Sequence, residues 1–382
     1  MSPGVSQAAM DPTAATVDVP ARARESRARP LAHAVLAEVR RDAPLLLVVA
    51  TYTAIVGGLC DALDRPTFFH PWVYMSAWTI GLVALLGAYV VVRELPHAVR
   101  ANPRRPLRTL AARLKPHVTP RFWAGVVLFM ASGLFTGTFT SAKSLMSEAL
   151  PFRSDALLAK LDAALFMGVD PWRVLQPVLG HPLVTRAIQN VYLCGWTALL
   201  IVLLGAVTFW PRLTHVRTRF YVIYFGAWIV LGNILAAVFL SGGPAYYAAL
   251  TGDHARFGPL MQYLSFSDGA LNSSVTLQHK LWAMYLGHHM EMGSGISAFP
   301  SLHVAMTTLF ALTAFHIDRR LGWLMSALAG VIFVGSVHLA WHYAVDGLFS
   351  GAFVTAAWFG MAALKPKPSA GEADRGWGIA SQ

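Results

Sequence analysis

The sequence predicts an all-α polytopic membrane protein, and three observations support this fold class. Hydrophobic residues make up 55% of the 382-residue chain, and the mean hydropathy is +0.51. Charged residues account for only 13%, which is about half of their usual share in soluble domains. The apolar residues are also gathered in stretches long enough to cross a bilayer as helices. Together these features exclude a soluble enzyme, a coiled coil and a disordered protein.

About eight stretches meet the length of roughly 20 mostly apolar residues that a membrane-spanning helix needs. They are 44–63, 72–94, 122–146, 182–209, 218–241, 298–316, 321–341 and 343–364. The loop 147–181 contains a short amphipathic stretch, Asp155–Phe166, and the longest loop is 242–297.

The flanking segments complete the predicted domain organisation. Residues 1–43 are rich in Ala, Arg, Pro and Ser, a composition that predicts a disordered cytoplasmic tail ending in a surface helix near 32–42. Residues 44–119 form two extra transmembrane helices and a basic cytoplasmic loop. Residues 120–365 are predicted to form a six-helix core, and residues 366–382 a second cytoplasmic tail.

Basic residues predict the orientation. They gather in five segments: the N-terminal tail (Arg22, Arg24, Arg27, Arg29, Arg40, Arg41), the loop after the second helix (Arg100, Arg104, Arg105, Arg108, Arg113, Lys115), the loop after the fourth (Arg212, Arg217, Arg219), the turn after the sixth (Arg319, Arg320) and the C-terminal tail (Lys365, Lys367). With eight helices all five lie on one side, which the positive-inside rule makes cytoplasmic. The net charge of +11 therefore needs no nucleic-acid partner. Cys60 and Cys194 both fall in apolar stretches, so neither a disulfide framework nor a Cys-based zinc site is expected.

Polar residues at the outer ends of helices are the candidates for function, since ionisable groups at membrane depth are costly. The first group is Ser297–His303. Ser297 suits an N-cap and Pro300 a first helical turn, which leaves backbone N–H groups free to bind an anion such as phosphate. Ser301 adds a hydroxyl, and His303 lies beside the anion. The alternative is an ordinary helix start with an interfacial histidine.

The second group contains His342 and Asp346, which lie one turn apart if the last helix includes both. A carboxylate at this spacing fixes the imidazole tautomer and leaves the other nitrogen as a base or nucleophile. His338 either shares this face as support or caps the preceding helix. The alternative is a His–Asp pair that only bridges helices. Taken together, an anion cradle and two histidines predict phosphoryl transfer through a phosphohistidine.

These residues resemble the motifs of the type 2 phosphatidic-acid phosphatase superfamily. That family reads Lys-x6-Arg-Pro, then Pro-Ser-Gly-His, then Ser-Arg-x5-His-x3-Asp. Residues 300–303 match the second motif with Leu302 in place of Gly, and His342 and Asp346 match the third. Gly335-Ser336 stands where the family has Ser-Arg, and the segment 241–247 has neither Lys nor Arg.

The departures point to one branch of the superfamily. Residues 295–305 and 341–347 resemble the inositolphosphotransferase-like branch, which includes fungal inositol phosphorylceramide synthase. The resemblance covers roughly 120–365. It implies that His342 is the nucleophile, His303 the acid and base, and Asp346 the residue that orients His342. It also implies that a phospho-head group such as phosphoinositol moves between lipids at the extracytoplasmic face.

Other residues must hold the phosphate if the motif cations are missing. Lys143 is the first candidate, followed by Arg153 and Arg186, although each also suits a snorkelling interfacial charge. Tyr246 and Tyr247 offer hydroxyls to phosphate or belong to an aromatic belt. The predicted phosphate-binding set is Ser301, Leu302, Lys143, Tyr246, Tyr247, Arg153 and Arg186, with Ser297 and His338 as support.

Two alternatives to a phosphotransferase stay open from the sequence. A phosphatase would use water as acceptor, and a metal-dependent hydrolase would use His338, His342 and Asp346 as ligands. A lipid transporter is disfavoured because no internal repeat is visible. His288, His289 and Glu291 have metal-binding composition but suit a solvated loop, so we predict no metal and no cofactor.

The predicted partners are the bilayer and a phospholipid, polyprenyl or sphingolipid substrate. The Ala- and Arg-rich composition suggests a bacterial inner membrane with the active site facing the periplasm. The sequence makes no prediction of oligomeric state.

Overall fold

The structure is a computed structural model that describes residues 21–364, with side chains from residue 31 onward. Within this range every secondary-structure element is helical and no β-strand occurs. The tail predictions for 1–20 and 366–382 lie outside the described residues.

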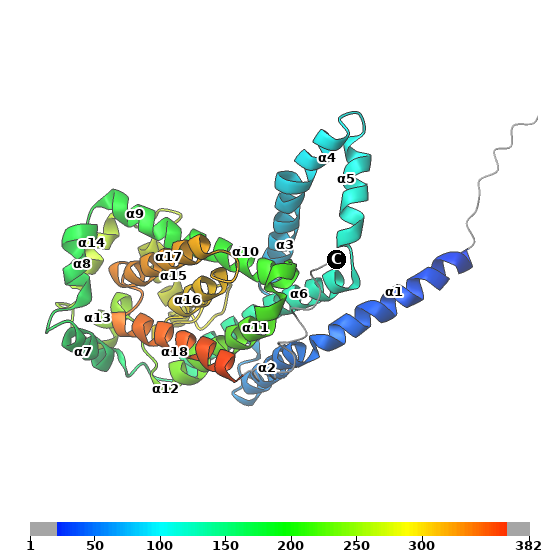
Figure 1. Cartoon of the computed structure of the whole chain (residues 1–382). Coiled ribbons are helices and arrows are strands. Elements are labelled where there is room, and N and C mark those ends of the chain that lie inside the picture. The colour runs from blue at the N-terminus through cyan, green and yellow to red at the C-terminus, as the bar shows by residue number, and fades with distance from the viewer. Residues whose placement is uncertain (1–20, 365–382) are drawn as a thin grey trace, which may run out of the picture.

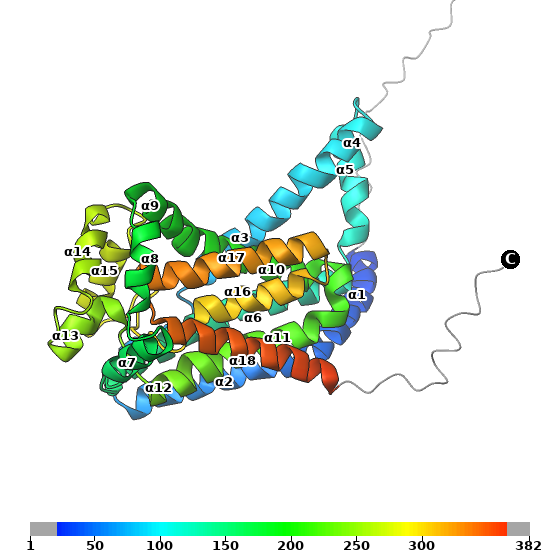
Figure 2. The ribbon, with the colours of Figure 1, turned by 60° about the vertical axis from the view of Figure 1, so that its left-hand side comes forward.

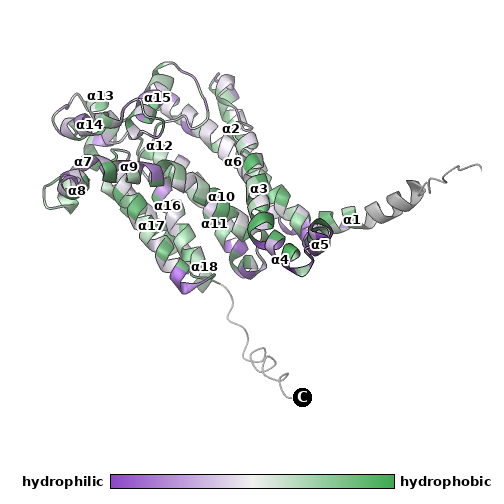
Figure 3. Cartoon of the chain, turned by 90° about the horizontal axis from the view of Figure 1, so that it is seen from above, coloured by the Kyte–Doolittle hydropathy of each residue, from purple (hydrophilic) through white to green (hydrophobic). Residues whose placement is uncertain are grey.

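Seven helical segments of the described chain are long and apolar enough to cross a membrane. They are α2 (Ala43–Ala62), α3 with α4 (Met75–Tyr89 and Leu95–Ala101), α6 (Pro120–Ala149), α9 with α10 (Pro182–Asn190 and Trp196–Phe209), α11 with α12 (Thr214–Ile229 and Ala236–Val238), α17 (Arg319–His338) and α18 (Ala344–Ala363). Hydrophobic residues dominate α3 and α10 (Figure 3). The chain is therefore an all-α polytopic membrane protein, as predicted.

The eighth predicted stretch is shorter than expected. The sequence predicted a helix over 298–316, whereas α16 runs only from Leu302 to Ala314. Ser301 is its N-cap and has an extended backbone. Residues 297–301 therefore form a loop, and Pro300 precedes the helix instead of occupying its first turn.

Local sequence signals explain where other helices begin. Thr119 caps α6 by accepting the Phe122 N–H at 3.2 Å, and Pro120 follows at the first helical position. Asp318 caps α17 by accepting the N–H groups of Arg320 and Leu321. Such caps satisfy backbone donors that the helix itself leaves free.

Most helices outside the membrane-spanning set gather at the two ends of the bundle (Figures 1 and 2). At one end lie α7 (Asp155–Leu165), α8 (Pro171–Leu179), α13 (Tyr247–Thr251), α14 (Gly258–Leu264) and α15 (Ser274–Leu286). At the other end lie α1 (Ala21–Arg41) and the hairpin of α4 with α5 (Pro106–Leu114). The first group, which we call the cap end, comes from the loops predicted to lie opposite the basic segments.

Basic residues of several segments meet at the far end from the cap. Arg217 donates to both carboxylate oxygens of Asp42 at 2.6 and 3.0 Å, and Arg121 donates to the same carboxylate at 3.1 Å. Arg219 lies 3.1 Å from His316 and stacks on Trp358 near the end of α18. We call this the basic end.

One prediction for the N-terminal segment is wrong. Residues 1–43 were expected to be mostly disordered with a helix only near 32–42, but α1 already begins at Ala21. The sequence 21–41 contains no glycine and one proline among many Ala, Arg and Glu residues. These are strong helix formers, and their charge masked the signal of apolar periodicity.

Candidate active site

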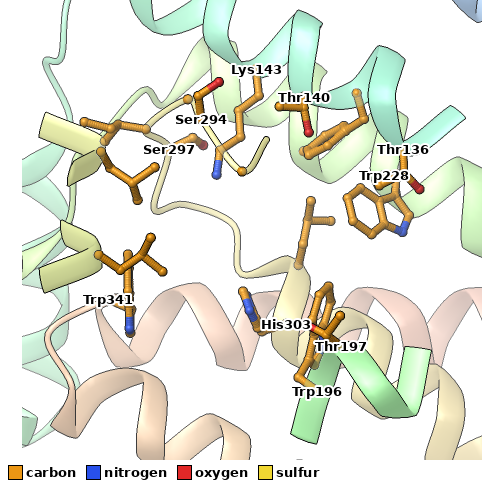
Figure 4. A pocket seen from close by; sticks show the side chains of 18 of the residues that line it. Thr136, Thr140, Lys143, Trp196, Thr197, Trp228, Ser294, Ser297, His303 and Trp341 are labelled. Atoms are coloured by element: carbon orange, nitrogen blue, oxygen red, sulfur yellow. The ribbon is translucent and has the colours of Figure 1, made fainter. Parts of the chain in front are cut away.

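A cavity of about 320 Å³ lies inside the bundle near the cap end. Its walls come from α3, α6, α10, α11 with its π-helical extension, the loop 293–297 and the junction between α17 and α18. In Figure 4, Lys143, Ser294 and Ser297 lie towards one end and Thr136 and Trp228 towards the other, with His303 on the opposite wall below Lys143. The cavity is thus polar at one end and apolar at the other.

His303 is held at the cavity by aromatic rings. It is the second residue of α16. Its ring stacks on Tyr192 with centroids 4.5 Å apart, and the ring of Trp196 lies 4.3 Å away. Tyr192 belongs to a π-helical turn, Val191–Gly195, that joins α9 to α10. Such turns often occur at functional sites because they redirect side chains.

His342 lies opposite His303 in the same cavity, and the two ring centroids are 6.3 Å apart. Its Nδ1 lies 3.3 Å from Oδ2 of Asp346. His342 precedes α18, which begins at Ala344, so the two residues do not share a helical turn as the sequence predicted. The same oxygen accepts the Tyr343 N–H at 3.0 Å, which fixes the carboxylate at the start of α18. Burial and the nearby charge of Lys143 lower the pKa of His342 below its ordinary value, which favours the neutral ring.

Lys143 of α6 lines the polar end of the cavity. Among the described residues no carboxylate lies within ion-pair distance of its ammonium group. Gly295 packs directly on the backbone of this part of α6, with a positive φ of 88°. A Cβ atom at Gly295 would lie 2.8 Å from the Ser144 nitrogen. Only glycine therefore lets the loop approach Lys143 so closely.

Three further predicted residues line the cavity, and one is already bonded. Ser297 and Leu302 face it together with Tyr246. The Tyr246 hydroxyl donates to the carbonyl oxygen of Gln278 at 3.0 Å, which leaves only its lone pairs and ring for a ligand. Ser297 is not the N-cap that the sequence suggested, because Ser301 holds that position.

Other predicted residues lie outside the cavity lining. Arg153 and Arg186 are exposed, and Arg186 packs over the ring of Phe266 instead. Tyr247 packs edge-to-face on Phe257 with centroids 5.0 Å apart. Ser301 is fully buried, and its hydroxyl has no hydrogen-bond partner among the described residues.

The residues with metal-binding composition do not converge in the described part of the chain. His338 is buried and its Nε2 lies 2.9 Å from Oγ1 of Thr185, so it links α17 to α9. His288 contacts Glu148, whereas Glu291 pairs with Lys280. Within residues 31–364 no group of three or more His, Cys, Asp and Glu side chains is arranged to hold a metal ion.

Sequence reasoning missed two buried carboxylates on α7. Asp155 accepts the N–H groups of Gly242 and Gly243 at 2.9 and 2.8 Å, and also the Tyr343 hydroxyl at 2.8 Å. Its pKa is raised above the ordinary value by burial, against which these hydrogen bonds act.

Asp162 holds the start of α18 in a similar way. Its two oxygens accept the N–H groups of Ala344 and Val345, each at 2.7 Å. These bonds fix the first turn of α18, which begins two residues after His342. The only sequence signal was the pair of acids seven residues apart, which places both on one face of an otherwise apolar helix.

The fold is that of a polytopic membrane protein, and its cavity brings two histidines together with a partly buried lysine. The sequence profile of the PAP2 superfamily matches residues 156–361, more than half of the chain, and the chain belongs to this superfamily. It is an enzyme of the lipid phosphatase and phosphotransferase class. No curated protein and no solved structure matches it significantly. Lys143 and α3 lie before the matched segment.

Proposed function

We propose that this protein transfers a phospho-head group, such as phosphoinositol, between lipids through a phosphohistidine at His342. The observation that carries the proposal is the arrangement of His303 and His342 in one cavity with Lys143, with Asp346 bonded to His342. An oriented neutral imidazole is a nucleophile, and a second imidazole nearby can move the protons of the reaction.

In the first step, Nε2 of His342 attacks the phosphorus atom of the donor lipid. A P–N bond forms, and the P–O bond to the departing lipid alcohol breaks. His303 in its protonated form gives its proton to the leaving oxygen. Asp346 orients the ring through Nδ1 and balances the positive charge that develops on it.

In the second step, the hydroxyl group of the acceptor attacks the phosphohistidine. His303, now neutral, takes the hydroxyl proton as the new P–O bond forms. The P–N bond breaks and both histidines return to their starting states. The head group has then moved from one alcohol to the other without net consumption of protons.

The phosphate oxygens are proposed to bind Lys143 and the backbone N–H groups at the start of α16. Lys143 supplies the positive charge that the Lys and Arg residues of the superfamily motifs would otherwise provide. The helix start supplies aligned donors and the positive end of the helix dipole. Arg153, Arg186 and Tyr247 have no part in this proposal, because they lie outside the cavity lining.

The active site is proposed to face the periplasm of a bacterial inner membrane. The cavity lies near the cap end, and the basic residues meet at the opposite end, which the positive-inside rule assigns to the cytoplasm. The catalytic core is proposed to be 120–365, since Lys143 lies before the matched segment.

Trapping of the covalent intermediate tests the proposal. Purified protein is incubated with phosphatidylinositol, quenched in alkali and digested, and the peptide containing His342 is analysed by mass spectrometry. We expect a phosphoinositol adduct on His342 and its loss when diacylglycerol or ceramide is added as acceptor. Absence of any adduct together with head-group transfer would overturn the phosphohistidine.

Water is the alternative acceptor. The same incubation without an added alcohol separates the two cases, because a phosphatase releases free inositol phosphate at full rate. A transferase forms the new lipid and releases inositol phosphate only slowly.

A further inference from the structure

We propose that the apolar end of the cavity binds one hydrocarbon chain of the lipid substrate, and that α3 forms the wall that selects this chain. The inference rests on the proposed function, because it assigns a place to the part of the lipid that the phosphate-binding end does not hold. The evidence for the inference comes from the side chains at the apolar end of the cavity.

The walls of this apolar end are large hydrophobic side chains from four helices. We call this space the chain chamber, and its main lining residues are Trp78, Phe139, Trp196, Leu200, Ile201 and Trp228. Phe139 and Trp228 pack edge-to-face with centroids 4.6 Å apart, which makes that wall rigid. The chamber is continuous with the space that holds His303 and Lys143.

The hydroxyl groups that line the chamber are already bonded within the protein. Thr136 donates to the carbonyl oxygen of Ser132 at 2.9 Å, and Thr197 donates to that of Leu193 at 3.0 Å. Thr140 contacts the Tyr74 hydroxyl. These threonines therefore offer no free proton to a polar ligand. Apart from the indole N–H of Trp196, which has no hydrogen-bond partner among the described residues, the chamber offers a head group little to replace its lost hydration, whereas a hydrocarbon chain has none to lose.

The chamber also reaches the flank of the bundle. Thr197 lines it and yet is exposed on the outer surface of α10. On the neighbouring α3, Ile80 and Val83 are 69% and 65% exposed, so this flank is apolar and suited to contact lipid. A chain that enters between α3 and α10 would thus pass from the bilayer into the chamber without crossing water.

The α3 wall is an addition to the segment that matches the superfamily. Trp78 is only 4% exposed and packs on Phe129 with centroids 4.9 Å apart. A Cβ atom at Gly133 would lie 2.7 Å from the Trp78 ring, so the indole is locked against α6. Next to it, Ala77 lines the chamber with a small side chain. Ala77 and Trp78 are therefore the residues we assign to chain selection.

Photolabelling tests the chamber without any need for turnover. Phosphatidylinositol and phosphatidic acid, each with a diazirine on one acyl chain, are irradiated with the full-length protein in nanodiscs. We expect labels on Phe139, Leu200 or Trp228, which a chain that stays outside the bundle cannot touch because each is only 5% exposed. Labels confined to outward-facing residues such as Ile80 and Val202 would overturn the proposal.

A variant pair tests chain selection. Ala77→Trp fills the chamber, while Ser76→Trp adds the same side chain at the adjacent exposed position of α3. We expect Ala77→Trp to remove the buried labels and to lower kcat/KM for a long-chain donor at least tenfold. For a dihexanoyl donor with the same head group, kcat/KM should stay within twofold. Ser76→Trp should change neither.

The two readouts separate this inference from the proposed function. If wild-type protein turns over neither donor but acquires the buried labels, the chamber stands and the proposed function fails. Equal losses for long-chain and dihexanoyl donors in Ala77→Trp, with buried labels retained, would overturn the chamber while leaving transfer intact.

Discussion

The two ends of the bundle bury carboxylates in different ways. At the cap end, Asp155 accepts hydrogen bonds from backbone N–H groups of a loop beside the cavity, and Asp162 accepts them from the first N–H groups of α18. At the basic end, Asp42 pairs with the guanidinium groups of Arg217 and Arg121. Both arrangements satisfy a buried charge, as burial requires.

The difference lies in what each carboxylate holds. A guanidinium is carried on a long side chain, so the Asp42 cluster joins helices α2, α6 and α11 without fixing a loop. A backbone N–H has no such freedom, so Asp155 and Asp162 fix the main chain itself beside His342. The carboxylates of the cap end thus position the backbone beside the cavity, whereas Asp42 at the basic end holds helices together. Substitutions at the cap end should therefore lower activity, and those at the basic end should lower stability.

The largest contrast should come from two histidines, His342 in the cavity and His316 at the basic end. His342→Ala should lower kcat by at least about 10³-fold, because it removes the covalent route; that loss corresponds to about 4 kcal/mol. His316→Ala, which changes an exposed histidine at the basic end, should stay within threefold. Initial rates of head-group transfer measure both. A rate for His342→Ala within tenfold of wild type would contradict the nucleophile.

The second contrast compares cations inside and outside the cavity. Lys143→Met keeps the length of the side chain but removes its charge, and should cost about 10²–10³ in kcat, as loss of one preorganised donor does. Arg153→Ala and Arg186→Ala remove exposed charges and should change kcat less than twofold. Steady-state kinetics on the three purified variants measure the loss of kcat in each. Equal effects of all three would mean that Lys143 does not hold the phosphate.

The third contrast exchanges one carboxylate at each end. Asp162→Asn loses one of two charge-assisted bonds, worth about 1.5–3 kcal/mol, and as a positioning residue it should lower kcat roughly tenfold with little change in KM. Asp42→Asn breaks a buried ion pair and should lower stability by about 3–5 kcal/mol, with kcat per folded molecule unchanged. Activity and thermal unfolding in the same detergent measure both. Loss of stability without loss of kcat in Asp162→Asn would contradict the positioning role.

The sequence predicted most of the fold because the bilayer imposes simple rules. Spans follow from apolar length. The pairing of His342 with Asp346 follows from their closeness in sequence, although His342 lies before α18 and not on it. The early start of α1 and the late start of α16 at Leu302 were missed. Both depend on the local backbone conformation, which hydropathy does not predict.

The site was harder to predict because its partners are distant in sequence. The contacts of Asp155 and Asp162 join residues more than 80 positions apart, and spacing along one helix gives no access to them. The sequence favours Lys143 over Arg153 because Lys143 lies at the outer end of the third predicted span, but it does not show where either side chain points. In the structure Lys143 lines the cavity from α6, whereas Arg153 follows α6 and is exposed.

The smallest expected effect is a pH dependence confined to the cap end. Burial raises the pKa of Asp162 to about 6, although the N–H groups of Val345 and Ala344 oppose the shift. Because the folded pKa lies above the unfolded one, this group stabilises the fold fully below about pH 4, and that contribution is lost as pH rises through 6. Protonation nevertheless turns one oxygen into a donor, so the carboxyl can no longer accept both N–H groups well.

Acidification through pH 6 should therefore weaken the two hydrogen bonds that Asp162 accepts from the start of α18. It should not destabilise the fold through Asp162. Wild-type activity should fall towards that of Asp162→Asn, whose amide already accepts through only one oxygen. The ratio of the two rates should shrink from about ten at pH 7.5 towards one near pH 5, since about 1.4 kcal/mol of positioning is lost. In the control Asp42→Asn, the ratio to wild type should stay constant over this range. A constant ratio for Asp162→Asn as well would mean that its carboxylate does not position His342 by accepting these two bonds, and the contrast between the two ends would then rest on geometry alone.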